Sequence, residues 1–372
     1  MHIPDGYLSP STCAVLYAAA APFWYVALQR VKRLLSTRLV PLLSVFAAFS
    51  FVIMMFNLPL PGGTTGHAAG MAIATVVLGP WASMLAVSVA LLIQAVFFGD
   101  GGITAIGANC FNIAIVGSLV AHWVYRAIAG QSEPTARRRV VAGALAGYAA
   151  INAAALITAI EFGIQPELFK DAAGVPLYAP YPLSIAIPAM MLGHLTIAGL
   201  AEAVVTGGVI AYLQRTDPSL LKLHTLAPSA GVAAPAPRQG GWRSTTRLWV
   251  GMALLMILTP LGLLAAGTAW GEWGPDEFAS PEGRQEIGQV SGNVLPPEQT
   301  PQGLEQLSSF WTSPIPDYAP PFLTSPELGY IMSALFGTGL VILACLAVGW
   351  LARLLRGRGD ADRPIEPEAG AA

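Results

Sequence analysis

Apolar residues in this chain gather into nine runs, which are separated by polar or glycine- and proline-containing segments. Most of the runs have roughly the 20 residues that a helix needs to cross about 30 Å of hydrocarbon. We predict helices at about 11–29, 39–57, 67–79, 81–98, 104–125, 140–160, 184–213, 248–268 and 328–352. The third and fourth runs are short and meet at Gly79-Pro80, so they can form one bent hairpin.

The composition agrees with a membrane protein. Of the 372 residues, 54% are hydrophobic and only 11% are charged. A water-soluble fold cannot bury that much apolar surface. The predicted fold class is an all-α polytopic membrane protein, with a seven-helix bundle followed by a two-helix accessory module that carries a long external loop. Because residues 1–6 have no basic region typical of a signal peptide, we expect the native N-terminus to be retained.

The basic residues predict the orientation. All but two of the 19 Lys and Arg residues lie after the first, fifth, seventh or last predicted helix. In a chain that crosses the membrane with each helix, these four places face the same side. The exceptions are Lys170 and Arg284, which lie in loops where acidic residues collect. The positive-inside rule therefore places the N-terminus outside and the C-terminus in the cytoplasm, and it favours an odd number of spans such as nine.

Composition shifts along the chain predict its domain organisation. Residues 1–214 form the seven-helix domain, and residues 215–246, rich in Ala, Pro and Gly, have the composition of a cytoplasmic linker. Residues 247–356 form the two-helix domain, and we expect its external loop at 270–326 to have little regular structure. Residues 357–372 are predicted to be a disordered cytoplasmic tail.

Several kinds of chemistry are disfavoured by the motifs. Cys13, Cys110 and Cys345 lie in or beside apolar runs without C-x-x-C spacing, which is typical of buried free thiols. No lysine follows a glycine, so there is no P-loop for ATP. The hydrolase motifs G-x-S-x-G and H-E-x-x-H are also missing from the sequence, which disfavours an intramembrane hydrolase.

The extreme N-terminus carries the clearest candidate chemistry. The α-amine of Met1, the amide nitrogen of His2 and the imidazole Nδ1 of His2 can close two chelate rings around one metal ion. Three nitrogens in a plane suit Ni(II), Cu(II) or Co(II) better than Mg(II) or Ca(II). His67, at the end of a glycine-rich segment predicted to be an external loop, is the best candidate for the fourth ligand. Taken alone, each of these histidines is more often a solvated or hydrogen-bonded residue.

Other polar residues could support these ligands or take part in transport. The candidates are Asn57, Thr64, Thr65 and Glu202. Glu202 lies within an apolar helix, where a carboxylate has either a structural role or a transport role. We expect His122 and His194 to be structural, while Asn109 and Asn112 can hydrogen-bond the metal-site loops or satisfy backbone between helices.

Three segments of the first domain together resemble the CbiM/NikM family, the substrate-specificity subunits of energy-coupling-factor transporters for cobalt and nickel. These segments are residues 1–10 (MHIPDGYLSP), 62–67 (GGTTGH) and 201–207 (AEAVVTG). The resemblance covers roughly residues 1–215. It implies that the N-terminal amine, the second-residue amide and imidazole, and the loop histidine hold the metal, which assigns these roles to Met1, His2 and His67.

The resemblance also implies partners and a second domain. The expected partners are a transmembrane coupling subunit similar to CbiQ/NikQ and cytoplasmic ATPase subunits similar to CbiO/NikO, with no nucleic acid. No cofactor is expected beyond the transported Ni(II) or Co(II), and ATP would be hydrolysed on the partner chains. Residues 247–356 resemble the NikN-type, or PDGLE, domain, although Gln302 stands where that motif has Asp. This departure weakens any role for the loop's carboxylates in metal binding.

The expected function is therefore metal capture for an importer in a bacterial or archaeal cell membrane. The NikN-like domain favours nickel over cobalt, but these residues do not separate the two ions. One alternative is a secondary permease coupled to protons, with Glu202 or His194 as the relay. Another is a vitamin-binding subunit of the same transporter class, which the His2 and His67 pair disfavours.

Overall fold

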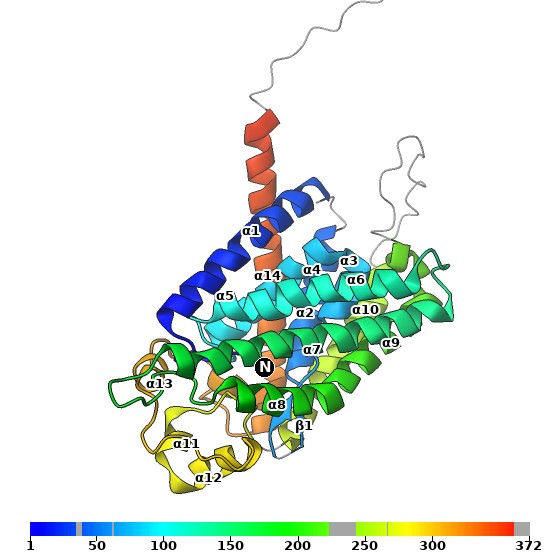
Figure 1. Ribbon diagram of the computed structural model, residues 1–372. Helices are drawn as coiled ribbons and strands as arrows, with labels where there is room; N and C mark the ends of the chain where they lie inside the picture. Colours follow the sequence, from blue (N-terminus) through cyan, green and yellow to red (C-terminus); the bar gives the residue numbers. More distant parts are fainter. Residues whose placement is uncertain (35–38, 62, 223–242, 266, 361–372) are drawn as a thin grey trace, which may run out of the picture.

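A helical bundle forms the body of the computed structural model (Figure 1), which describes residues 1–34, 39–61, 63–222, 243–265 and 267–360. The first-domain helices are α1 (Pro10–Leu34), α2 (Leu39–Met54), α3 (Met71–Leu78), α4 (Pro80–Ile93), α5 (Ile106–Asn109), α6 (Gly117–Ala129), α7 (Arg137–Leu168), α8 (Leu183–Gly193) and α9 (Gly199–Thr216). Wider π turns extend or join some of these helices at η1 (Gln94–Phe98), η2 (Cys110–Val116) and η3 (His194–Ala198). A helix therefore lies within each of the seven apolar runs of the first domain.

The second domain has more regular structure than predicted. Its long helices are α10 (Arg243–Leu258) and α14 (Pro326–Asp360), and α10 is followed by the 3₁₀ turn η5 (Thr259–Leu264). Residues 270–326 were expected to form an external loop with little regular structure, but they contain α11 (Pro275–Ala279), α12 (Pro281–Val290), α13 (Gln302–Leu307) and η6 (Pro316–Tyr318). Prolines at the helix starts explain part of this difference, because proline is well suited to a first helical turn.

The predicted linker and tail lie partly outside the described residues. The first part of the linker is ordered, because α9 ends at Thr216 and η4 (Pro218–Lys222) follows it, whereas residues 223–242 are not described. Helix α14 continues to Asp360, so the tail predicted to be disordered from residue 357 begins as helix. Residues 361–372 are not described.

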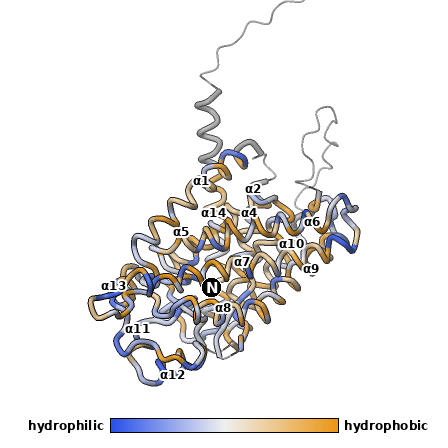
Figure 2. The backbone as a smooth tube through the Cα atoms, in the orientation of Figure 1, coloured by the Kyte–Doolittle hydropathy of each residue, from blue (hydrophilic) through white to orange (hydrophobic). Residues whose placement is uncertain are grey.

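Seven helices among the described residues are long and apolar enough to cross a membrane, and Val40–Met54 is a shorter apolar helix. Large apolar side chains on these helices point outward, including Val204, Leu254 and Leu343, which are 73%, 56% and 63% exposed. Figure 2 shows that hydrophobic residues cover the helical body, whereas hydrophilic residues gather at its ends. This surface is suited to lipid.

Helix α3 corrects the prediction for the third span. With eight residues it rises about 12 Å, which is too short to cross the hydrocarbon region. It begins at Met71 instead of residue 67, because Gly70 is left-handed (φ 69°) and residues before it are not helical. A short hairpin of β1 (Leu58–Pro59) and β2 (Thr65–Gly66) precedes them. Thus an extended segment, buried from Thr64 to Gly70, and a short helix occupy the place of a full helix.

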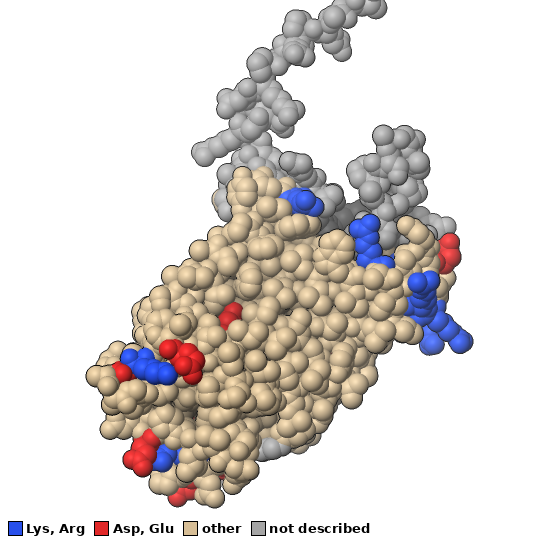
Figure 3. All heavy atoms as spheres, in the orientation of Figure 1, with Lys and Arg blue, Asp and Glu red and all other residues tan. Residues whose placement is uncertain are grey.

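The charged side chains separate between the two ends of the molecule. On the face seen in Figure 3, Lys and Arg gather mainly at the end where α6, α7 and α9 meet their loops. Asp and Glu gather mainly at the opposite end, near α11, α12 and α13. Lys170 is an exception to this separation, and it pairs with Glu167 at 3.3 Å.

The helices of the second domain pack directly against the first domain. Helix α14 contacts α2 and α4, and α10 lies along α2. A Cβ atom on Gly337 of α14 would lie only 2.1 Å from the Phe51 ring of α2, so a glycine is required for this approach. The three cysteines are buried and free, as predicted.

Candidate metal site

The first nine residues, here called the N-terminal strap, run into the bundle. Met1, His2 and Ile3 are only 3%, 2% and 0% exposed, and Figure 1 places the N-terminus in the middle of the bundle. Chain termini are usually on the surface and poorly ordered unless other groups hold them. The buried position of this terminus therefore needs specific partners.

Asn109 and Gly102 hold the strap through its backbone. Asn109 Oδ1 accepts from the Ile3 amide at 2.8 Å, and Asn109 Nδ2 donates to the Ile3 carbonyl at 3.1 Å. The Gly102 amide donates to the same carbonyl at 2.8 Å. Asp5 accepts from the Ile103 and Thr104 amides at 3.1 and 2.8 Å. These bonds fix the register of the strap, and thus the place of Met1 and His2.

Replacing Gly102 by alanine is expected to displace the strap. A Cβ atom there would lie 2.3 Å from the Asp5 backbone nitrogen, a contact that backbone must move to relieve. Overpacking of this kind typically costs about 1–3 kcal/mol, which corresponds to roughly 5- to 150-fold in affinity. Nickel titration of Gly102→Ala would measure the loss. Gly208→Ala is the matched control, because no atom lies within 4 Å of a Cβ there; equal affinities would contradict the prediction.

His67 lies against His2. Its side chain is buried, and the two imidazole rings stack with centroids 5.0 Å apart and an interplanar angle of 28°. His67 Nδ1 lies 3.1 Å from the Ala68 carbonyl, so an Nδ1–H donor there leaves the lone pair on Nε2. Burial, together with nearby His2 and the terminal amine, lowers the pKa of His67 to about 3. A neutral imidazole of this kind can bind a metal ion.

Glu202 of α9 holds the backbone that follows His67. Its Oε2 accepts from the Ala69 amide at 2.7 Å and the Gly70 amide at 3.0 Å. The Glu202 side chain is completely buried. Non-helical backbone at membrane depth requires such partners within the protein. Glu202 therefore has a positional role for the His67 segment.

Two carboxylates beside the histidines and the amine were not predicted from the sequence. Asp100 Oδ1 lies 2.5 Å from His2 Nδ1, and Glu272 Oε1 lies 2.5 Å from the Met1 amine. Burial alone would raise the pKa of Asp100, but neighbouring His2 and a hydrogen bond from Tyr318 hold it well below its usual range. The acidic residue between Gly99 and Gly101, directly after an apolar run, was an available sequence signal for Asp100.

The donor set fits a transition-metal ion. His2 Nε2 is buried without a hydrogen bond, and His2 Nδ1 lies 2.5 Å from the Asp100 oxygen. Buried polar atoms without partners are unusual and point to a further binding group. Within the described ranges, no three His, Cys, Asp or Glu side chains cluster as metal ligands. The further nitrogen donors beside the two imidazoles are the Met1 amine and the backbone amides of the strap.

Four other candidate residues from the sequence have positions of their own in the structure: Thr64, Thr65, Asn57 and His194. Thr64 and Thr65 are buried in the segment before His67, and Gly62 of that segment is not described. Asn57 is half-buried after α2, where its amide donates to Met55. His194 is buried and its Nδ1 lies 2.8 Å from the Met190 carbonyl, which is a bond within its own helix.

The asparagines divide between two roles. Asn109 supports the strap, as shown by its two bonds to Ile3. Asn112 instead donates to Glu161 at 2.7 Å and Thr158 at 3.1 Å on α7. His122 lies on α6, where its ring packs edge-on against Trp123. Asn112 therefore contacts the neighbouring helix α7, whereas the ring contact of His122 is with its neighbour on α6.

Two known families match the chain. The sequence model of CbiM, described as the cobalt uptake substrate-specific transmembrane region, matches residues 2–220. The chain belongs to the CbiM family. The match includes His2, His67, Asp100 and Glu202. Met1 directly precedes it, whereas Glu272 and Tyr318 lie in the second domain. The PDGLE domain model matches residues 244–354, which include Glu272.

Relatives share both regions. The fused nickel transport protein NikMN of Rhodobacter capsulatus is 57% identical over 92% of this chain and 95% of its own length. The probable fused nickel transport protein LarMN of Lactiplantibacillus plantarum is 42% identical over 94% and 97%. A crystal structure of a truncated transition metal transporter is 51% identical, covers 58% of this chain and 99% of its own, and has a TM-score of 0.55. This CbiM-family chain is thus a membrane transport protein similar to known transition-metal transporters.

Proposed function

We propose that this chain captures nickel ions for an importer, and that its own N-terminus supplies most of the ligands. The observation that carries the proposal is the burial of Met1 and His2 against His67, with stacked imidazole rings. The terminal amine, the His2 amide, one His2 nitrogen and one His67 nitrogen would make four nitrogen ligands. Nitrogen donors suit Ni(II) and Co(II), and they disfavour Mg(II) and Ca(II).

Nickel is favoured over cobalt by the relatives. Two of the relatives most similar over the whole chain are named as fused nickel transport proteins, and both contain the accessory region. The CbiM family description names cobalt. Since four nitrogen ligands accept both ions, we expect cobalt to bind as well, with selection depending on geometry and supply.

Energy for import would come from other chains. The sequence has no P-loop, so we propose a transmembrane coupling subunit similar to CbiQ/NikQ and ATPase subunits similar to CbiO/NikO as partners. The separation of basic and acidic side chains supports a cell-membrane orientation with the N-terminus outside and the C-terminus in the cytoplasm. In this assignment residues 1–214 form the metal-binding domain, residues 215–246 the linker and residues 247–356 the accessory domain.

The proposal is tested by the metal affinity of the full chain purified with its native N-terminus. We expect one nickel ion per chain by calorimetry and metal analysis, with cobalt also bound and magnesium not bound. His67→Ala should weaken nickel binding by more than about 100-fold, since loss of a ligand exceeds the 10–100-fold typical of a supporting residue. His122→Ala is the control, because His122 lies on α6 away from the strap. Undiminished binding by His67→Ala would contradict the proposed ligand set.

A further inference from the structure

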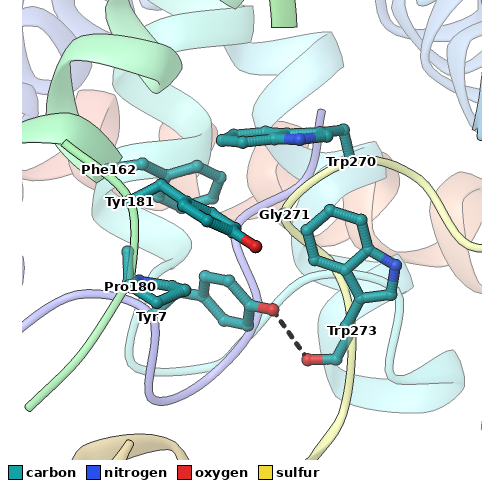
Figure 4. Close-up of a pocket in the computed structure, with 8 residues that line it drawn as sticks. Tyr7, Phe162, Pro180, Tyr181, Trp270, Gly271 and Trp273 are labelled. Atoms are coloured by element: carbon teal, nitrogen blue, oxygen red, sulfur yellow. Dashed lines mark hydrogen bonds between the residues drawn. The ribbon is translucent and has the colours of Figure 1, made fainter. Parts of the chain in front are cut away.

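The external segment of the second domain covers the N-terminal strap. Figure 4 shows Tyr7 of the strap among aromatic side chains from both domains, with Phe162 and Tyr181 from the first and Trp270 and Trp273 from the second. The Tyr7 hydroxyl donates to the Trp273 carbonyl at 2.8 Å. These contacts fix residues 270–273 directly beside the strap.

Glu272 lies in the middle of this contact. Glu272 is the last residue of a backbone turn over residues 269–272, because its amide donates to the Ala269 carbonyl at 3.0 Å. Gly271 has φ 82°, and a Cβ there would lie 2.4 Å from the Phe162 ring, so a glycine allows the turn to approach. The turn brings Glu272 Oε1 to 2.5 Å from the Met1 amine, whose residue is almost completely buried.

Tyr318 reaches the other side of the site. Its ring is buried and stacks on Phe98 with centroids 4.8 Å apart. Its hydroxyl donates to Asp100 Oδ2 at 2.5 Å and accepts from Gln94 Nε2 at 2.9 Å. The other oxygen of Asp100 is the one that faces His2 Nδ1. Tyr318 therefore fixes the carboxylate that contacts the imidazole.

The backbone at Tyr318 is itself unusual. Asp317 and Tyr318 both have left-handed dihedral angles, with φ of 52° and 60°. Non-glycine residues adopt this region only where the surrounding structure imposes it, and such residues cluster at functional sites. Here the surroundings are the aromatic stack on Phe98 and the hydroxyl bonds to Asp100 and Gln94.

We propose that the second domain completes the metal-capture site through two positioning residues, Glu272 at the Met1 amine and Tyr318 at the Asp100 carboxylate. This inference rests on the proposed function. A metal-bound primary amine keeps two N–H groups, so Glu272 can still accept a hydrogen bond from it when nickel is present. Asp100, held by Tyr318, places a negative charge beside His2, where it favours a divalent cation.

Positioning of this kind differs from simple docking of one domain on another. Docking alone depends on the buried aromatic surface, which Tyr318→Phe retains. The positioning role depends on one hydroxyl, which Tyr318→Phe removes. Outer partners of metal ligands typically contribute 10–100-fold to metal affinity, so the two roles predict clearly different results.

The first arm of the test compares Tyr318→Phe with Tyr330→Phe in the full chain. Tyr330 is buried in the same aromatic group, 5.6 Å from the Tyr318 ring, and its hydroxyl has no hydrogen bond to the described residues. We expect Tyr318→Phe to weaken nickel binding by about tenfold or more and to shift the ligand-field absorption of the bound ion. We expect Tyr330→Phe to bind with the wild-type affinity and spectrum.

The second arm compares Glu272→Ala with Glu286→Ala, an exposed carboxylate on α12 of the same segment. We expect Glu272→Ala to weaken nickel binding by about tenfold or more. Without metal, its Met1 amine should react faster with an amine-specific reagent. Glu272→Gln keeps an acceptor oxygen and should recover most of the affinity. Glu286→Ala should match the wild type in both measurements.

The outcomes separate the inference from the proposed function. Wild-type nickel affinity and spectrum in both Tyr318→Phe and Glu272→Ala, with binding weakened in His67→Ala, would overturn the inference and leave the capture function intact. A wild-type chain that binds neither nickel nor cobalt would overturn the proposed function and the inference with it.

Discussion

Adding one residue before Met1 is expected to abolish high-affinity nickel binding. The extension converts the amine into an amide nitrogen, which removes a basic ligand and changes both chelate rings. It also needs space where little exists, because Met1 is 3% exposed and its nitrogen contacts Glu272 at 2.5 Å. Both effects act on the same nitrogen, so we expect a larger loss than for any single side-chain replacement.

The measurement is calorimetric nickel titration of the extended chain beside the native one. One residue added after Ala372 is the matched control, since the C-terminal end lies outside the described residues and far along the chain from the strap. Mass spectrometry must verify that Met1 is intact and unblocked in the native sample. If the N-terminally extended chain binds nickel as tightly as the native chain, the amine is not a ligand.

The second large effect is expected for Glu202→Ala. The replacement leaves the Ala69 and Gly70 amides without their acceptor inside the bundle. Each buried unsatisfied group costs about 1–3 kcal/mol, so the segment after His67 loses roughly 2–6 kcal/mol of stabilisation. Displacement of His67 should then lower nickel affinity by at least about tenfold, because every 1.4 kcal/mol corresponds to one factor of ten.

Glu202→Gln separates the hydrogen bonds from the charge. Its side-chain oxygen can still accept from both amides, so we expect most of the affinity and thermal stability in detergent to return. Nickel titration and thermal unfolding of both variants test the prediction. Wild-type affinity in Glu202→Ala would show that the His67 segment holds its position without this carboxylate. Proton-dependent transport that fails in Glu202→Gln would instead support the relay of a secondary permease.

Hydropathy was a reliable guide to the helices, because each apolar run must be helical to satisfy its backbone in a membrane. It was misleading at residues 67–70, which lie in an apolar run but are not helical. Protein side chains can replace the missing helical bonds there, as Glu202 does from 132 residues away in sequence. No local pattern records such an acceptor.

The accessory segment was underestimated for a related reason. Its high content of Pro, Gly and acidic residues is typical of irregular loops, yet the structure contains α11, α12 and α13. Short helices of this kind are stabilised by packing on a neighbouring surface more than by periodic apolar positions. Here the surface is the first domain, where Gly6 approaches the backbone of Leu304 so closely that a Cβ would lie 2.6 Å away.

The sequence by itself determined the membrane class and the apolar helices, because these depend on composition and on residues close together in the chain. It also predicted nitrogen donors at Met1, His2 and His67, from their chemistry and from the family resemblance. Only the tertiary structure decided which groups surround those donors. Asp100, Glu202, Glu272 and Tyr318 lie far apart in sequence. Long-range contacts alone bring Asp100 and Glu272 to the strap, Tyr318 to Asp100, and Glu202 to the segment after His67. Apart from the two glycines that flank Asp100, such contacts leave no periodic or spacing signal, since any buried carboxylate or hydroxyl at the right place can make them.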